Sequence, residues 1–206
     1  KFARIAHANN VPLIIDNTFP TPILCRPIEH GADIVVHSTT KYMDGHAMCV
    51  GGAIVDSGNF DWDKYGDKFH GLTTPDDSYH GVTYTKKFGK TAYITKATVQ
   101  LMRDLGSVPS PMNSFLLNIG LETLHLRVPK HCENALKVAT WLENNEKVAW
   151  VNYPGLKGNK YYDRAQKYMP NGTCGVISFG LKGGRDVSVA FMDSLELVAI
   201  VTHVAD

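Results

Sequence analysis

Two charged side chains of opposite character follow two short apolar runs of the sequence. Asp16 comes directly after Val-Pro-Leu-Ile-Ile, and Lys41 follows Asp-Ile-Val-Val with four polar residues between them. A lysine amine can form an imine with an aldehyde, and a carboxylate can keep a pyridine ring nitrogen protonated. Ser38 and Thr40 lie two residues apart, so in an extended segment their hydroxyls point to one side and can hold a phosphate. These four side chains supply the groups that pyridoxal 5'-phosphate (PLP) requires.

The two apolar runs, residues 11–15 and 33–36, have the composition of parallel strands that are buried on both faces. Both are rich in β-branched residues, lack polar alternation and end abruptly in polar residues. Open α/β sheets bind ligands at the carboxyl ends of such strands. We therefore expect this edge of the sheet to bring Asp16 and Lys41 to one ligand.

The remaining elements are predicted from periodicity and composition. Residues 57–91 are rich in Gly, Asp, Tyr and Thr, show little periodicity and indicate a long ordered excursion over the surface. Apolar positions over residues 111–145 predict one or two long helices, interrupted at Pro129. Shorter elements are predicted at residues 1–10 (helix), 51–55 (antiparallel or edge strand), 148–151 (strand), 160–168 (helix), 176–181 (strand) and after Gly184 (helix).

A domain boundary is expected near residue 118. Residues 1–118 would form the C-terminal part of a large α/β domain, and residues 119–206 an incomplete smaller α+β domain. The chain opens inside a predicted helix and stops without a closing element, so we expect it to be a piece of a longer protein.

Composition argues for a small-molecule partner. The 206 residues are 44% hydrophobic, and 21 Lys and Arg against 20 Asp and Glu give no charge field that would favour nucleic acid or a membrane surface. The four cysteines are widely spaced without a C-x-x-C pair, which favours reduced thiols in a cytoplasmic protein over a metal site or a disulfide framework. No apolar run approaches the roughly 18 residues that a membrane helix needs.

A continuous stretch around the candidate side chains resembles a known enzyme family. The segment IIDNTFPTPILCRPIEHGADIVVHSTTKYMDGHAMCVGG is similar to the cofactor-binding segment of the Cys/Met-metabolism family of PLP-dependent enzymes. The shared pattern runs from DNTF through GAD, HS-x-TK and GH to GG without a gap. Later segments resemble the family in the same order: LETLHLRVPKHCENALKVATWLE, VNYPGL, KYYDRAQKYMP and ISFGLKGG.

This resemblance implies a fold and a set of residue roles. The fold would be α/β, the PLP-dependent transferase fold type I that is similar to aspartate aminotransferase. Lys41 would form the Schiff base and Asp16 would pair with the pyridine nitrogen, while Ser38 and Thr40 would bind phosphate and Thr18 would lie beside the ring. The family's phosphate-binding glycine loop, its stacking aromatic and the Tyr and Arg of a neighbouring subunit would precede residue 1, and its substrate-carboxylate arginine would follow residue 206. The family also implies a homotetramer built from dimers.

Within the family, the segment PDDSYHGVTY and the long insert before it are similar to O-acetylhomoserine sulfhydrylases. Those enzymes replace the γ-acetoxy group of O-acetylhomoserine with sulfide or methanethiol, giving homocysteine or methionine. The alternative within the family is the γ-elimination or replacement carried out by methionine γ-lyase, cystathionine γ-synthase or cystathionine lyase, because cofactor binding is common to all of these.

Two hypotheses from other classes of protein have less support than a PLP-dependent enzyme. A binding or scaffold protein that kept the fold but lost catalysis would not require the intact pair of Lys41 and Asp16. A nucleotide-binding protein would be expected to carry G-x-G-x-x-G or G-x-x-x-x-G-K-[ST], and neither occurs.

Other polar residues have a structural interpretation beside a functional one. His37 and His46 are expected to be hydrogen-bonded structural groups more often than acid–base catalysts. Cys25 and Cys49 are expected to be small buried side chains. Tyr79 and His80 lie in the insert, where a role in shaping substrate access stands beside a purely structural one.

Overall fold

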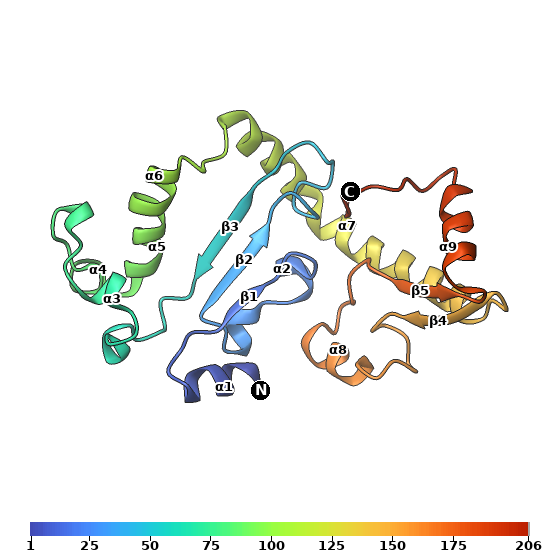
Figure 1. The fold of residues 1–206 in the computed structure, drawn as a ribbon, viewed down its shortest axis with the longest axis horizontal. Coiled ribbons are helices and arrows are strands. Elements are labelled where there is room, and N and C mark those ends of the chain that lie inside the picture. The colour runs from blue at the N-terminus through green and yellow to red at the C-terminus, as the bar shows by residue number, and fades with distance from the viewer. Residues whose placement is uncertain (206) are drawn as a thin grey trace. The chain divides into compact units, whose positions relative to one another are not determined.

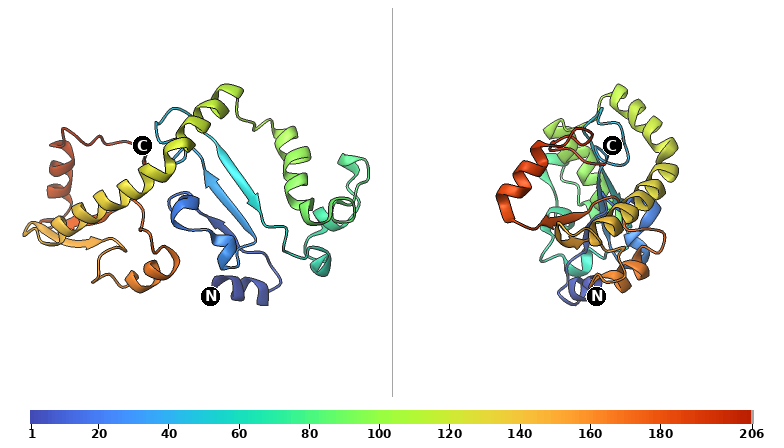
Figure 2. Two further views of the ribbon diagram at one scale, coloured as in Figure 1. Left: turned by 180° about the vertical axis from the view of Figure 1, so that it is seen from behind. Right: turned by 90° about the vertical axis from the view of Figure 1, so that its right-hand side faces the viewer.

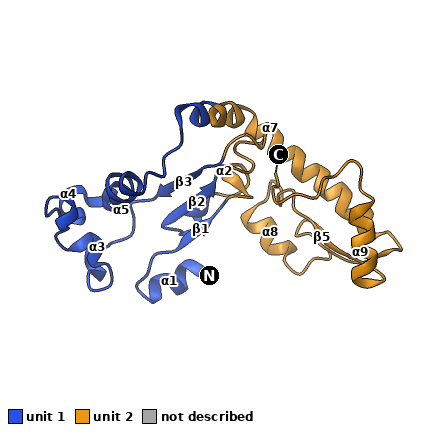
Figure 3. Cartoon of the chain, turned by 45° about the horizontal axis from the view of Figure 1, so that its top comes forward, with its two compact units in different colours: residues 1–17, 26–39, 50–115 blue, residues 18–25, 40–49, 116–206 orange. Residues whose placement is uncertain are grey.

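The structure is a computed structural model that describes residues 1–205. It contains two compact units, which are coloured separately in Figure 3. Unit 1 comprises residues 1–17, 26–39 and 50–115, and unit 2 comprises residues 18–25, 40–49 and the chain from residue 116 onward. Along the chain, the boundary after which all residues belong to unit 2 falls between residues 115 and 116. Two short earlier segments, around Thr18 and Lys41, also belong to unit 2.

Unit 1 is built on a three-stranded sheet in the order β1-β2-β3 (Figure 1). Strand β1 (Ile14–Asp16) is parallel to β2 (Ile34–Ser38), and β2 is antiparallel to β3 (Gly52–Asp56). The predicted parallel pairing and the antiparallel neighbour are confirmed. The expected burial holds for most of β2 but is wrong for β1, whose Ile14 and Asp16 are exposed. Asp16 pairs in register with Val36, so both strands end at the same edge of the sheet.

The first strand is shorter than predicted because a side chain takes the place of a strand partner. The Leu13 N–H donates to the carboxylate of buried Asp33 over 2.7 Å instead of to a neighbouring strand. The same carboxylate oxygen lies 2.8 Å from His7 Nε2 on helix α1 (Phe2–Ala8). Asp33 thereby joins the predicted N-terminal helix to the start of the sheet.

Short helices follow β3 in unit 1. They are α3 (His70–Thr73), α4 (Tyr84–Phe88), α5 (Ala92–Lys96) and α6 (Arg103–Leu105), with a π-helical segment, Ala97–Met102, between the last two. The prediction that residues 57–91 are ordered is confirmed. The short helices were not predicted, because several have only three to five residues. Aromatic rings hold them together in a core that includes Trp62, Tyr84, Phe60, Phe69 and Tyr93.

Unit 2 is organised along helix α7 (Pro111–Glu143), whose first five residues belong to unit 1. Short helix α2 (Thr21–Leu24) contributes to one core of this unit, and strands β4 (Val148–Asn152) and β5 (Ser178–Leu181) form an antiparallel pair. Helix α8 (Tyr162–Tyr168) lies between those strands in sequence, and α9 (Gly184–Asp193) follows β5, as two further views show (Figure 2). These four elements were predicted.

Of the predicted one or two helices the structure has one: α7 is a single helix of 33 residues with Pro129 inside it, so the expected interruption does not occur. Proline removes a single backbone donor from the helix, and here packing on both sides of it offsets that loss. Pro129 is exposed, while one stripe of buried side chains runs past it along the helix. The stripe consists of Gly120, Leu124, Val128, Cys132, Ala135, Ala139 and Leu142. Among residues 1–205, no helix is both long and apolar enough to cross a bilayer.

Candidate cofactor site

The carboxyl ends of β1 and β2 carry two of the predicted site residues. Asp16 is the last residue of β1 and Ser38 the last of β2. The N–H of Asn17 donates to the carbonyl of Val36 over 2.9 Å, so the parallel pairing extends one residue beyond Asp16. Asp16 is exposed and Ser38 is half-buried. Unit 1 thus brings a carboxylate and a hydroxyl to one edge of its sheet, as predicted.

A buried histidine lies at the same edge. Burial lowers the pKa of His37, although the charge of Asp16 and a hydrogen bond with the Asn17 backbone act in the opposite direction. The imidazole is therefore neutral at pH 7. The expected hydrogen bonding of His37 is present with the Asn17 backbone, whereas its buried Nδ1 has no hydrogen-bond partner among the described residues.

Two glycines let β3 approach the end of β2 closely. The Thr39 N–H donates to the Gly51 carbonyl over 3.0 Å, and a Cβ atom added at Gly51 would lie 2.7 Å from Thr39 Oγ1. A Cβ atom added at Gly52 would lie 3.4 Å from the His37 carbonyl oxygen. The backbones of residues 37–39 and 51–52 therefore approach closely, which a larger side chain at either glycine would hinder.

Unit 2 contains the other three predicted site residues. Thr18 is buried, whereas Thr40 and Lys41 are half-buried. The N–H of Gly45 donates to the Lys41 carbonyl over 2.9 Å, which closes a turn over residues 41–45 that we call the Lys41 turn. Within residues 1–205, the Lys41 amine makes no hydrogen bond or ion pair.

The next residue, Tyr42, anchors the turn in the core of unit 2. Its hydroxyl oxygen accepts the Gly175 N–H over 3.1 Å, and its ring packs edge-on against Phe19 and His131. Burial raises the pKa of Tyr42 to about 12, with smaller contributions from neighbouring thiols. The phenol therefore stays protonated at neutral pH and supports the turn rather than acting as a base.

The Asp44 carboxylate stabilises the turn from within. It is fully buried and accepts hydrogen bonds from the Met48 N–H (2.9 Å), the Cys49 thiol (3.4 Å) and the His46 N–H (3.4 Å). Burial alone would raise the pKa of Asp44, but these hydrogen bonds together lower it. Burial, and then Asp44 itself, raise the pKa of the Cys49 thiol, so Cys49 is a neutral buried side chain as expected. His46 Nδ1 lies 2.6 Å from the Asp44 carbonyl oxygen and is hydrogen-bonded as expected.

Arg127 on α7 is a support that sequence reasoning missed. Its Nη1 donates to the Tyr42 carbonyl over 2.8 Å, and its Nη2 donates to the Gly120 carbonyl over 2.7 Å. The dipeptide Asp-Gly at residues 44–45 is a turn signal that could have located the Lys41 turn. No local signal could have paired Arg127 with a residue 85 positions earlier in the sequence.

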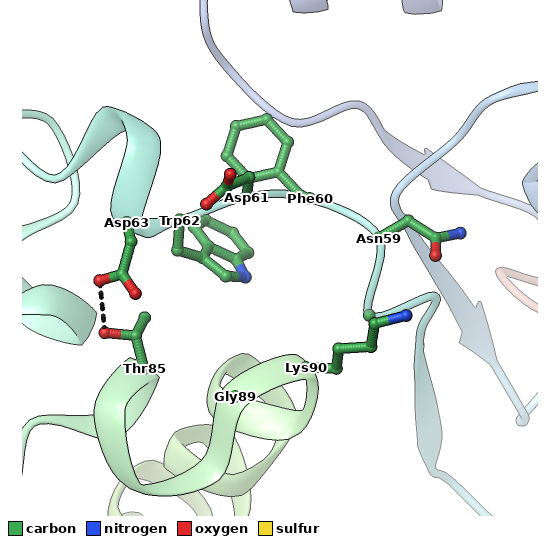
Figure 4. A pocket seen from close by; sticks show the side chains of 9 residues that line it. Asn59, Phe60, Asp61, Trp62, Asp63, Thr85, Gly89 and Lys90 are labelled. Carbon is green, nitrogen blue, oxygen red and sulfur yellow. Dashed lines mark hydrogen bonds between the residues drawn. The ribbon is translucent and has the colours of Figure 1, made fainter.

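Two cavities of unit 1 do not coincide with the predicted site. One of about 270 Å³ is lined by residues 58–63 with Thr85, Gly89 and Lys90 (Figure 4). Its Asp63 carboxylate already accepts the Thr85 hydroxyl over 2.8 Å and lies 3.2 Å from the Lys86 amine. Another, of about 570 Å³, has a largely apolar lining that includes Ile14, Ile34 and Ile54. Neither is lined by Asp16 or Ser38.

Comparison with known proteins then assigns the family. The model of the family described as "Cys/Met metabolism PLP-dependent enzyme" matches residues 1–206. The chain belongs to this family. The expected family, and PLP as the family's cofactor, are therefore confirmed. The donor set described above fits that cofactor, because the chain offers a carboxylate at Asp16, an amine at Lys41 and hydroxyls at Ser38 and Thr40.

Relatives within the family carry consistent names. The chain is 45% identical to the O-acetyl-L-homoserine sulfhydrylase of Leptospira meyeri over 99% of the chain and 48% of that protein. It is 46% identical to the homocysteine synthase of Schizosaccharomyces pombe over 100% of the chain and 48% of that protein. The chain therefore spans about half the length of the curated relatives that it matches.

A solved structure supports the fold. The putative O-acetylhomoserine (thiol)-lyase of Campylobacter jejuni superimposes with a TM-score of 0.92 at 35% sequence identity, over 100% of this chain and 50% of that one. That protein contains N'-pyridoxyl-lysine-5'-monophosphate. The expected PLP-dependent transferase fold type I is confirmed.

Proposed function

We propose that the protein is a PLP-dependent γ-replacement enzyme that converts O-acetylhomoserine and sulfide, or methanethiol, to homocysteine or methionine and acetate. The observation that carries the proposal is the edge of the unit 1 sheet, where Asp16 and Ser38 end two parallel strands and the Lys41 turn follows three residues after Ser38. Ligands of open α/β sheets bind at such edges.

The proposed roles follow the chemistry of each side chain. Lys41 holds PLP covalently through its amine, and the Asp16 carboxylate keeps the pyridine nitrogen protonated. Ser38 and Thr40 donate hydrogen bonds to the phosphate, and Thr18 lies beside the ring. His37 at the same sheet edge interacts electrostatically with Asp16, which raises the pKa of His37 against the larger effect of burial.

PLP, when bound, supplies an electron sink that makes the protons at Cα and Cβ of an amino-acid substrate acidic. With PLP and substrate bound, the free amine of Lys41 would accept and return protons at Cα and Cβ of the substrate. The γ-acetoxy group leaves as acetate, and the thiol adds at Cγ.

Two observations favour sulfhydrylation over the lyase reactions. The relatives quoted above are named for sulfhydrylation or homocysteine synthesis. The PDDSYHG segment, which is similar to sulfhydrylases, is an ordered part of unit 1: Asp76 lies 2.7 Å from the Lys96 amine and accepts the Ser78 hydroxyl over 2.6 Å.

We also propose that residues 1–118 belong to the large cofactor-binding domain and residues 119–206 to the small domain of a cytoplasmic homotetramer. Sedimentation of the whole protein tests the assembly.

Product analysis tests the reaction. The whole protein is incubated with O-acetylhomoserine, with and without sulfide, and homocysteine, acetate, 2-oxobutyrate and ammonia are quantified. We expect homocysteine and acetate in equal amounts, dependent on sulfide, and neither product with the Lys41→Ala variant. If 2-oxobutyrate and ammonia dominate in the presence of sulfide, the protein is a γ-lyase and the proposal is wrong.

A further inference from the structure

The guanidinium of Arg127 links the Lys41 turn to helix α7. Nη1 donates to the Tyr42 carbonyl (2.8 Å), Nη2 to the Gly120 carbonyl (2.7 Å) and Nε to the Thr123 hydroxyl (2.9 Å). All three nitrogens of the planar group are therefore engaged. One of the acceptors belongs to the turn and two belong to the helix, so the side chain bridges backbone carbonyls of both.

Two glycines make this contact possible. A Cβ atom at Gly45, whose φ is +66°, would lie under 3.0 Å from the Arg127 guanidinium. A Cβ atom at Gly120 would lie under 3.0 Å from the carbonyl oxygen of Met43. The turn, the guanidinium and the helix therefore touch one another without an intervening side chain.

Electrostatics favour the same arrangement. The guanidinium is half-buried, and burial disfavours its charged form, but the Asp44 carboxylate attracts it. Asp44 is itself held in place by hydrogen bonds from residues 46–49. A charged donor thus lies on one side of the turn and a fixed carboxylate within it.

We propose that Arg127 is a positioning residue that fixes the Lys41 turn on α7 and thereby directs the Lys41 amine for cofactor attachment. This inference rests on the proposed function, because it assigns Lys41 to PLP. Lysine has a flexible four-carbon stem, so the direction of its amine depends on how firmly its backbone is held. Lysine in place of Arg127 would retain the charge but not the planar fork that reaches two carbonyls at once.

The test measures attachment rather than turnover. Whole protein freed of cofactor is mixed with PLP, and the visible absorption band of lysine-bound PLP is followed with time and pH. Hydrogen exchange of the amides of residues 41–46 is measured in the cofactor-free protein. The variants are Arg127→Met, Arg127→Lys and Gly45→Ala; the last keeps the arginine but places a methyl group against it. Arg164→Met, an exposed arginine of α8, is the matched control, and Leu156→Ala lowers the stability of the same unit through a different core.

We expect all three variants to slow attachment, on the order of tenfold or more, and to speed exchange in residues 41–46. Arg164→Met should behave like the wild type, and Leu156→Ala should lower Tm without slowing attachment. Attachment to Arg127→Met and Arg127→Lys at the rate of Arg164→Met would overturn the inference, even if Tm fell. A wild-type protein that acquires no band would instead overturn the proposed function.

Discussion

Gly120 on α7 faces the carbonyl oxygen of Asp44 in the Lys41 turn so closely that an added Cβ atom would lie under 3.0 Å from it. The obstacle is backbone, which cannot move aside without displacing the turn or the helix. Although alanine is the better helix former by about 1 kcal/mol, we expect overpacking to dominate in Gly120→Ala and to lower the free energy of unfolding by about 1–3 kcal/mol.

Urea unfolding of the whole protein measures this effect. The control is Gly71→Ala in α3, where the nearest atom to an added Cβ is the flexible end of Lys96 at 3.7 Å. Gly71→Ala should be neutral or slightly stabilising. A Gly120→Ala protein as stable as the wild type would show that α7 and the Lys41 turn are not packed as described.

The second prediction is that the Asp76 carboxylate makes the stability of the fold depend on pH. The hydrogen bond from Lys96, and then those from Ser78, lower the pKa of Asp76 to about 2. Because the pKa is depressed in the folded protein, the stabilisation is present above the unfolded pKa of about 3.9 and is lost as the pH falls towards 2. Thermal unfolding between pH 6 and pH 2 should therefore show Asp76→Asn a few degrees below the wild type at pH 6, with the gap closing below about pH 4. A gap that stays constant down to pH 2, or a similar loss in the exposed control Asp67→Asn, would contradict this interpretation.

The third prediction separates phosphate contacts from the rest of the site. Ser38→Ala and Thr40→Ala each remove a hydrogen bond to a charged group, so each should raise the Kd for PLP about tenfold or more. Pyridoxal, which has no phosphate, should bind both variants as it binds the wild type. Thr74→Ala, which removes an exposed hydroxyl of unit 1, should change neither Kd. An equal loss with both ligands would assign the two hydroxyls a structural role.

The fourth prediction concerns the ring nitrogen. In Asp16→Asn an amide replaces the carboxylate and cannot hold the nitrogen protonated, so kcat should fall about 10- to 100-fold while PLP still attaches to Lys41. Asp16→Glu keeps the charge and should lose less. Steady-state kinetics and the visible spectrum distinguish these effects, and an Asp16→Asn enzyme with wild-type kcat would exclude the proposed pairing.

The sequence predicted the sheet edge well because its signals are local. Abrupt polar residues after two β-branched runs located Asp16 and Ser38, and the register of β1 with β2 places both at one edge. The sequence predicted that Lys41 follows the second strand, but it did not predict the turn that carries Lys41. Its supports were not predicted, since Arg127 and Gly120 come from a helix far along the chain and acquire their role only through folding.

Cooperative packing explains the remaining differences. Pro129 carries a helix-breaking signal, but a continuous buried stripe from Gly120 to Leu142 keeps α7 intact. The short helices of unit 1 carry too few residues for a period to be detected, and aromatic contacts such as Trp62 with Tyr93 hold them in place. In both cases tertiary contacts override or replace the local signal.

Covalent attachment of PLP to Lys41 can be measured directly. Whole protein loaded with PLP is reduced with borohydride, digested and mapped by mass spectrometry, with Lys41→Ala treated in parallel. We expect a pyridoxyl group on the peptide that contains Lys41 and none on the corresponding peptide of the variant. A pyridoxyl group on another lysine, or on the variant to the same extent, would contradict attachment at Lys41.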